Sequence, residues 1–125
     1  MNHVVTVSLV IAAVIHLLPL SGVIGVQRLE LLYGTPIMDP NLEILMRHRA
    51  VLFGMLGMFL LFAAFRPQLQ VPAFVLGFTS VLSFLWLAWS VGGYNAHIGR
   101  VFAADIVALV ALVVGAVAYA LPRAP

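Results

Sequence analysis

The sequence predicts an all-α fold: a bundle of four transmembrane helices with a short interfacial segment between helices 1 and 2. The chain is 64% hydrophobic and only 8% charged, whereas soluble domains have about half apolar and a quarter charged residues. Its apolar residues fall into four segments, each near the about 20 residues that cross a bilayer core as a helix. The length of 125 residues fits one integral membrane domain, residues 1–125.

The first two helices are predicted at about residues 4–26 and 42–65. The chain start lacks a positively charged region and a good cleavage site, so we expect the first helix to be retained and not removed as a signal peptide. The second helix is expected to stop at the Arg66-Pro67 pair, because proline cannot continue a helix.

The stretch QRLELLYGTPIMDPN, residues 27–41, is the longest hydrophilic part of the chain. Its beginning predicts a short interfacial helix, and Asn41 is expected to cap the second membrane helix. The third and fourth helices are predicted at about 71–91 and 100–121. Small residues recur every three or four positions from 104 to 118, which predicts close packing of the fourth helix.

Four crossings put both termini and the 66–70 turn on one side, and the loops 27–41 and 92–100 on the other. Counting the helical rise from each loop places the polar residues of all four helices in the half of the bundle near the loops. We predict a ligand-binding site there, with no catalytic and no metal-ligating residue assigned. Its candidate residues are His16, Arg47, His48, Arg49, Trp86, Trp89, Asn95, Arg100 and Asp105.

Asp105 is the one acid well inside a predicted span, since Glu43 stands at the very start of the second. An unpaired charge at this depth costs about 3 kcal/mol even on mild insertion scales, so we expect Asp105 to pair with an arginine. The pair either fixes only the helix register or belongs to a pocket whose charge a ligand completes. Arg47, His48 and Arg49 outweigh one acid, which favours an anionic or acceptor-rich ligand: a lipid phosphate, a carboxylate or a quinone carbonyl.

Other interpretations of these residues stay open. His16 and His48 are the minimum for bis-histidine haem ligation in a bundle, although membrane histidines are more often hydrogen-bonded core groups or parts of a proton path. Trp86 and Trp89 are either an interfacial anchor or a pocket wall. The stretch YNAHIGR, with Asn95, is either a polar turn that starts a helix or a lid on the pocket.

The chain contains no cysteine, no stripe of basic residues, no phosphate-binding loop and no zinc or nucleophile motif. The lack of a basic stripe argues against nucleic-acid binding, and the lack of the other motifs argues against soluble nucleotide chemistry. We therefore favour a small binding or accessory protein over an enzyme, with a lipid head group or quinone as ligand. The alternatives are a haem- or quinone-linked redox subunit and a proton-coupled small transporter that uses His16, His48 and Asp105.

Two stretches, MRHRAVLFGMLG (46–57) and GGYNAHIGRVFAAD (92–105), follow a retained first helix and a long polar loop. This layout resembles the DoxX-like group of small bacterial four-helix membrane proteins. The resemblance implies an inner-membrane bundle, and some members of the group are linked to quinone or redox systems. Arg47, His48, Arg49 and Arg100 match its polar features, and the motif defines no catalytic residue.

The arginines bear on orientation through the positive-inside rule. Four lie on the loop side and two on the terminal side: 28, 47, 49 and 100 against 66 and 123. Setting aside the arginines expected to be buried leaves nearly equal counts, and we expect cytoplasmic termini. The expected partners are the lipid bilayer, the amphipathic or anionic ligand, and a second copy or a membrane partner protein.

Overall fold

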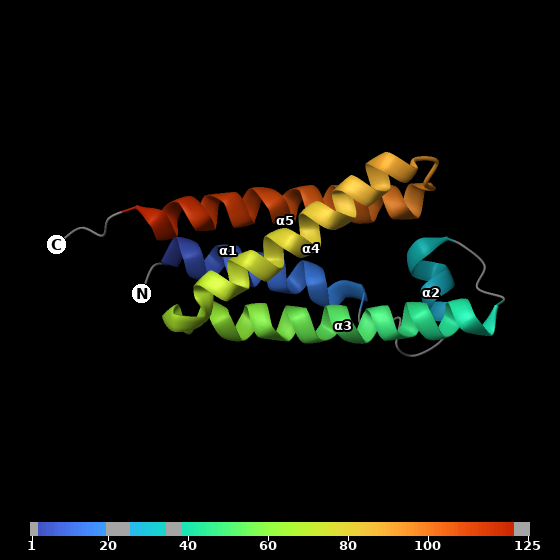
Figure 1. The fold of residues 1–125 in the computed structure, drawn as a ribbon, viewed down its shortest axis with the longest axis horizontal. Helices are drawn as coiled ribbons and strands as arrows, with labels where there is room; N and C mark the ends of the chain where they lie inside the picture. Colours follow the sequence, from blue (N-terminus) through green and yellow to red (C-terminus); the bar gives the residue numbers. More distant parts are fainter. Residues whose placement is uncertain (1–2, 20–25, 35–38, 122–125) are drawn as a thin grey trace.

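The computed structural model describes residues 3–19, 26–34 and 39–121, which form a bundle of helices (Figure 1). The all-α class is confirmed, since no residue in these three ranges belongs to a strand. In chain order the elements are α1 (His3–Leu17), α2 (Val26–Tyr33), α3 (Pro40–Ala64), η2 (Pro67–Leu69), α4 (Gln70–Val91) and α5 (Ala96–Ala120).

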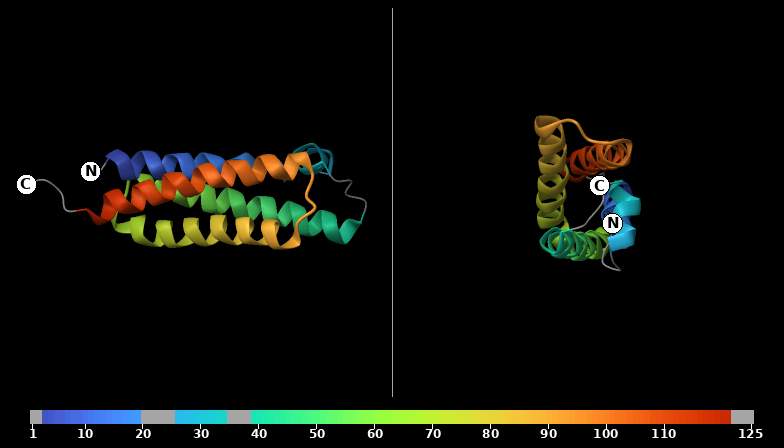
Figure 2. Two further views of the ribbon diagram at one scale, coloured as in Figure 1. Left: turned by 90° about the horizontal axis from the view of Figure 1, so that it is seen from above. Right: turned by 90° about the vertical axis from the view of Figure 1, so that its right-hand side faces the viewer.

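The four longer helices are arranged in a square. Helix α1 packs against α3 and α5, and α4 packs against the same two helices. The end-on view in Figure 2 shows that α3 and α5 therefore face each other across a diagonal. Helix α4 crosses the bundle obliquely, from the end of α3 towards the beginning of α5 (Figure 1). The beginning of α1, the end of α5 and the α3–α4 turn lie at one end of the bundle, as predicted.

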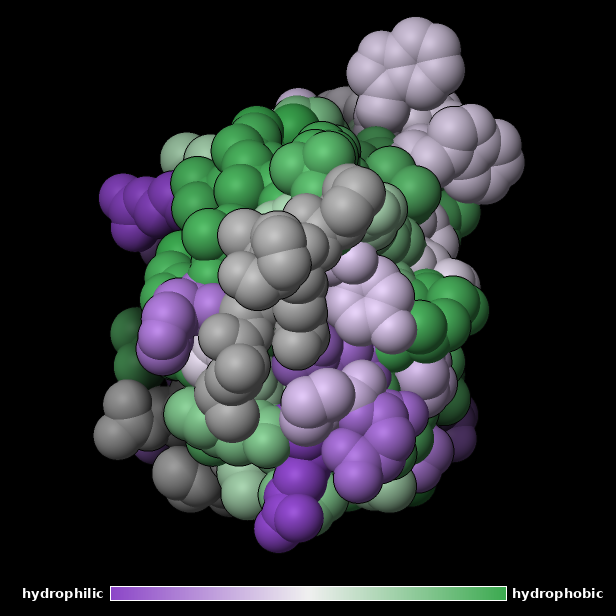
Figure 3. Space-filling view, turned by 90° about the vertical axis from the view of Figure 1, so that its left-hand side faces the viewer, coloured by the Kyte–Doolittle hydropathy of each residue, from purple (hydrophilic) through white to green (hydrophobic). Residues whose placement is uncertain are grey.

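Three helical stretches are long and apolar enough to cross a membrane: 40–64, 67–91 and 96–120. Helix α1 is also apolar but has 15 residues, which span about 22 Å of a hydrocarbon core about 30 Å thick. Large apolar side chains are exposed along the outer faces of these helices. Figure 3, which views the bundle from the end where α1 begins and α5 ends, shows green hydrophobic surface interspersed with purple polar residues. The chain is a membrane protein of helical-bundle type.

Several helix ends differ from the prediction. Helix α1 ends at Leu17 and not near residue 26, because Pro19 lacks the N–H that would continue the helix; residues 20–25 lie outside the described part. The predicted cap of the second membrane helix is wrong, since the side chain of Asp39 accepts the N–H of Asn41. Helix α5 starts earlier than predicted, directly after Asn95, whose side chain caps it. Helix α2 confirms the short helix between the first two apolar segments.

Small residues bring the helices into close contact. A Cβ added at Gly115 of α5 would lie 2.6 Å from the Cβ of Ser8 in α1, and one added at Gly57 of α3 would lie 3.1 Å from the carbonyl oxygen of Ala13. Both glycines are buried. Side chains of any size at these positions would separate α1 from its two neighbours, which agrees with the predicted packing role of small residues.

Candidate functional site

A cavity of about 280 Å³ lies at the end of the bundle that carries α2 and the α4–α5 loop. All five α-helices contribute to its wall, and we call it the interfacial cavity. Its polar lining consists of His16, Tyr33, Arg49, His97, Arg100 and Asp105. Its apolar lining consists of Ile15, Leu18, Pro19, Leu31, Phe53, Phe84, Val101 and Ala104. Four of the candidate residues from the sequence therefore meet in one place.

Asp105 and Arg49 face the cavity from opposite helices. The Asp105 side chain is buried, with 9% of its residue surface exposed, and Arg49 is the charged residue that acts on it electrostatically. No ion pair joins Asp105 to an arginine in the described ranges. The predicted direct pair is wrong because α3 and α5 lie on a diagonal of the bundle, with the cavity between them.

Arg49 is held by aromatic groups. One Nη1–H donates to the hydroxyl of Tyr33, and the guanidinium carbon lies 4.4 Å from the ring centroid of Phe53 and 5.4 Å from that of Tyr33. An arginine has five N–H donors, so most of those on Arg49 find no acceptor among the described residues. They are available to a ligand in the cavity.

Helix α2 contributes Leu31 and Tyr33 to the wall of the cavity. The carbonyl of Tyr33, its last residue, accepts a 2.7 Å hydrogen bond from Nδ2 of Asn95, and Tyr33 is almost fully buried. Gly34 follows with φ +64°, and a Cβ there would lie 2.5 Å from Cδ2 of His97. Tyr33 and Gly34 thus connect α2 both to Arg49 on α3 and to the start of α5.

His16 forms the inner wall of the cavity and is fully hydrogen-bonded. Its Nδ1 lies 2.7 Å from the carbonyl of Ala12 and its Nε2 lies 2.9 Å from the hydroxyl of Ser80. A carbonyl only accepts, so Nδ1 donates to Ala12, and in the neutral ring Nε2 accepts from the hydroxyl of Ser80. His48 is exposed on α3 and outside the cavity lining. The structure therefore does not bring the two histidines together for haem, and no metal-binding cluster occurs in the described ranges.

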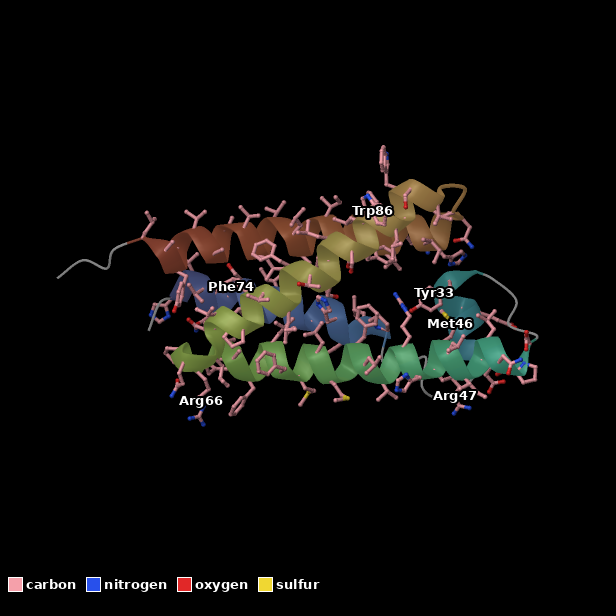
Figure 4. The ribbon with its side chains drawn as sticks, viewed as in Figure 1. Tyr33, Met46, Arg47, Arg66, Phe74 and Trp86 are labelled. Atoms are coloured by element: carbon pink, nitrogen blue, oxygen red, sulfur yellow. The ribbon has the colours of Figure 1, made fainter. Side chains whose placement is uncertain are left out.

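Arg47 and His48 were predicted to line the site and do not. Arg47 lies on the outer face of α3 (Figure 4), where it forms a 3.2 Å ion pair with Glu43 one turn earlier. Residues 47 and 49 are about 200° apart around a helix, so only one of the two arginines can point inward. In the structure, Arg49 is the one that points towards the cavity.

Trp86 and Trp89 also lie outside the cavity, with 63% and 76% of their surface exposed near the end of α4. Figure 4 shows Trp86 on the far side of α4 from α3. Tryptophans exposed near one end of a membrane helix are typical of an interfacial anchor. Asn95 is not in the lining either, and its role is to hold Tyr33 and cap α5.

Tyr33, Phe53 and Phe84 also line the cavity, although they are not among the residues predicted from the sequence. Phe53 and Phe84 stand in apolar runs, where nothing distinguishes an inward ring from one that faces lipid. Tyr33 had a signal: a tyrosine directly before a glycine at the end of a helical pattern, in a polar loop. His97 and Arg100, weighed as part of a lid, line the cavity.

Replacing Asn95 with alanine is expected to lower the free energy of unfolding by about 1 kcal/mol for the lost cap, and to increase hydrogen exchange in α2. The increase follows because the bond to the Tyr33 carbonyl is lost as well. The Asp39→Ala variant is the control, because it removes a helix cap that does not contact Tyr33. Equal exchange of α2 in both variants would contradict this role of Asn95.

The chain is thus a small helical membrane protein with a mixed polar and apolar cavity at one end of the bundle. Comparison of the chain with family models, curated proteins and solved structures finds no match in any of the three.

Proposed function

We propose that this chain is a small membrane binding or accessory protein, and that the interfacial cavity holds the polar head of an amphipathic ligand. The observation that carries the proposal is the meeting of Arg49, Arg100 and Asp105 around one cavity with an apolar wall. Its volume is near the lower end of the range of about 300–1,000 Å³ for small-molecule sites. It suits a head group and the first part of a chain better than a whole lipid.

The depth of the cavity supports an amphipathic ligand. Helices α3 and α5 each have 25 residues and a length of about 37 Å, which exceeds the hydrocarbon core of about 30 Å. The cavity residues Arg49, Arg100 and Asp105 lie in the halves of these helices that begin at the α2 end. Trp86 and Trp89 are exposed at the same end. A ligand there would have its head at the interface and its chain in the bilayer.

The charge of the lining supports an anionic or acceptor-rich head. Among the arginines and acids of the lining, Arg49 and Arg100 carry two positive charges against the one negative charge of Asp105. Both arginines offer N–H donors to the cavity. A lipid head group, a carboxylate or a quinone carbonyl would accept these donors, and an anion would also balance the charge.

The same proposal places the chain in a bacterial inner membrane, in keeping with its resemblance to the DoxX-like group, which stays a prediction. Arg49 and Arg100 line the cavity and are set aside in the positive-inside count. The remaining arginines are two on each side: 28 and 47 against 66 and 123. Cytoplasmic termini and a second copy or membrane protein as partner also stay predictions.

The ligand class is tested by thermal unfolding in a neutral detergent with added dodecanoate or dodecyltrimethylammonium. Dodecanoate at a hundred times its Kd is expected to stabilise the protein by about 2.7 kcal/mol, a shift of roughly 10 °C in Tm. The cation is expected to give no shift. The Arg49→Gln variant should lose the shift. The Arg47→Gln variant, two residues away and outside the cavity, should keep it. Equal shifts with both amphiphiles, or an unchanged shift in Arg49→Gln, would overturn the proposal.

A further inference from the structure

Asp105 is a buried carboxylate without a hydrogen bond to any residue that the structure describes. Its oxygens are not sealed in the protein, because no fully enclosed polar atom of the described part lacks a partner. They therefore keep some accessible surface, and Asp105 forms part of the wall of the interfacial cavity. An ionised carboxylate only accepts hydrogen bonds, and leaving it buried without a donor is costly.

None of the arginine and histidine side chains of the lining donates a hydrogen bond to Asp105 in the part of the chain that the structure describes. Arg49 donates to the hydroxyl of Tyr33, and the Nδ1–H of His16 donates to the carbonyl of Ala12. Arg100 lies on the same helix as Asp105 and forms no ion pair with it. A donor on the ligand would complete the site.

We propose that the ligand is an amphipathic carboxylic acid with a hydroxyl group within the first few carbons of its chain. Its carboxylate accepts hydrogen bonds from Arg49 and Arg100, and its hydroxyl donates to Asp105. Its chain lies against the apolar wall formed by Phe53, Phe84 and neighbouring residues. This inference rests on the proposed function and adds the hydroxyl to the ligand's description.

The ligand's hydroxyl determines whether the ligand is attracted to the Asp105 carboxylate or repelled by it. A carboxylate ligand balances the net positive charge of the lining, but without a donor it also brings a second negative charge towards Asp105. Two carboxylates that share one site disfavour each other's charged form. A hydroxyl placed between them replaces this contact with a charge-assisted hydrogen bond, which is about twice as strong as a neutral one. The site should therefore prefer the hydroxylated acid over the plain acid.

The experiment measures the Kd of decanoate, 2-hydroxydecanoate and 3-hydroxydecanoate for the full chain in a neutral detergent, by titration calorimetry. One of the hydroxylated acids is expected to bind the wild-type protein at least about tenfold more tightly than decanoate, equivalent to 1.4 kcal/mol. In the Asp105→Leu variant this ratio is expected to fall to about one, because leucine has a similar size and no acceptor. Decanoate itself should bind that variant at least as tightly as it binds the wild type.

The outcomes separate this inference from the proposed function. Equal affinity of the wild type for all three acids, with binding lost in Arg49→Gln, would overturn the hydroxyl contact and keep the cavity as the site. A tenfold preference that persists in Asp105→Leu would overturn the role of Asp105. Failure of all three acids to bind would overturn both. The wild-type ratio needs no variant, so the inference can fail even if Asp105→Leu does not fold.

Discussion

Replacing Gly115 with alanine is expected to lower the free energy of unfolding by about 2 kcal/mol, the usual cost of overpacking a tight core. The new Cβ would lie 2.6 Å from the Cβ of Ser8 and 3.1 Å from the ring of Phe74. The Cβ of Ser8 is bonded directly to the backbone of α1 and cannot move independently of it. Helices α1 and α5 would therefore have to separate. Reversible unfolding in mild detergent, followed by circular dichroism, measures the change.

The matched control is Gly99→Ala on the same helix. A Cβ at Gly99 would meet only the ring of Tyr94, at 3.8 Å, which is ordinary contact. Alanine is favoured over glycine in a helix by about 1 kcal/mol, so Gly99→Ala should be neutral or stabilising. If both variants shift stability by the same amount, α1 and α5 do not pack as closely as the structure shows.

Replacing Gly34 with alanine is expected to weaken ligand binding as well as stability. Gly34 has φ +64°, where an alanine costs about 1–2 kcal/mol, and its Cβ would lie 2.5 Å from Cδ2 of His97. His97 lines the interfacial cavity, so displacing it moves the cavity wall. A further loss of about 1 kcal/mol in binding would weaken affinity about fivefold, measurable by the same calorimetric titration with decanoate.

Gly93→Ala separates the two effects. Gly93 has φ +68°, close to the value at Gly34, but a Cβ there would meet nothing within 4 Å. This variant should show the backbone cost alone and keep the affinity of the wild type. Equal affinities of Gly34→Ala and Gly93→Ala would mean that the contact between α2 and α5 does not shape the cavity.

The fold was largely predictable from the sequence because lipid as solvent constrains a chain so strongly. Long apolar segments that must satisfy their own backbone hydrogen bonds leave helices as the direct solution. The ends of the helices were less predictable. Whether Asp39 or Asn41 caps α3, or whether α1 ends before Pro19, depends on local competition between groups a few residues apart.

The depth of the site along the helices was predictable from the sequence, but the residues that form it were only partly predictable. Counting depth placed His16, Arg49, Arg100 and Asp105 together, because the helical rise is the same in every helix. The order of the helices around the bundle was not available from one sequence, so the diagonal position of α3 and α5 was missed. Because of this position, Asp105 and Arg49 do not form the expected ion pair but lie on opposite sides of the cavity.

Native mass spectrometry of the protein, released from mild detergent after purification with its membrane lipids, tests whether the interfacial cavity holds a ligand. We expect a discrete, stoichiometric adduct on the wild type and on Arg47→Gln, and its loss from Arg49→Gln. Fragmentation of the adduct should yield an acid that bears a hydroxyl. A bare mass for the wild type under gentle release, or an adduct that persists unchanged in Arg49→Gln, would contradict the claim that the interfacial cavity is a binding site.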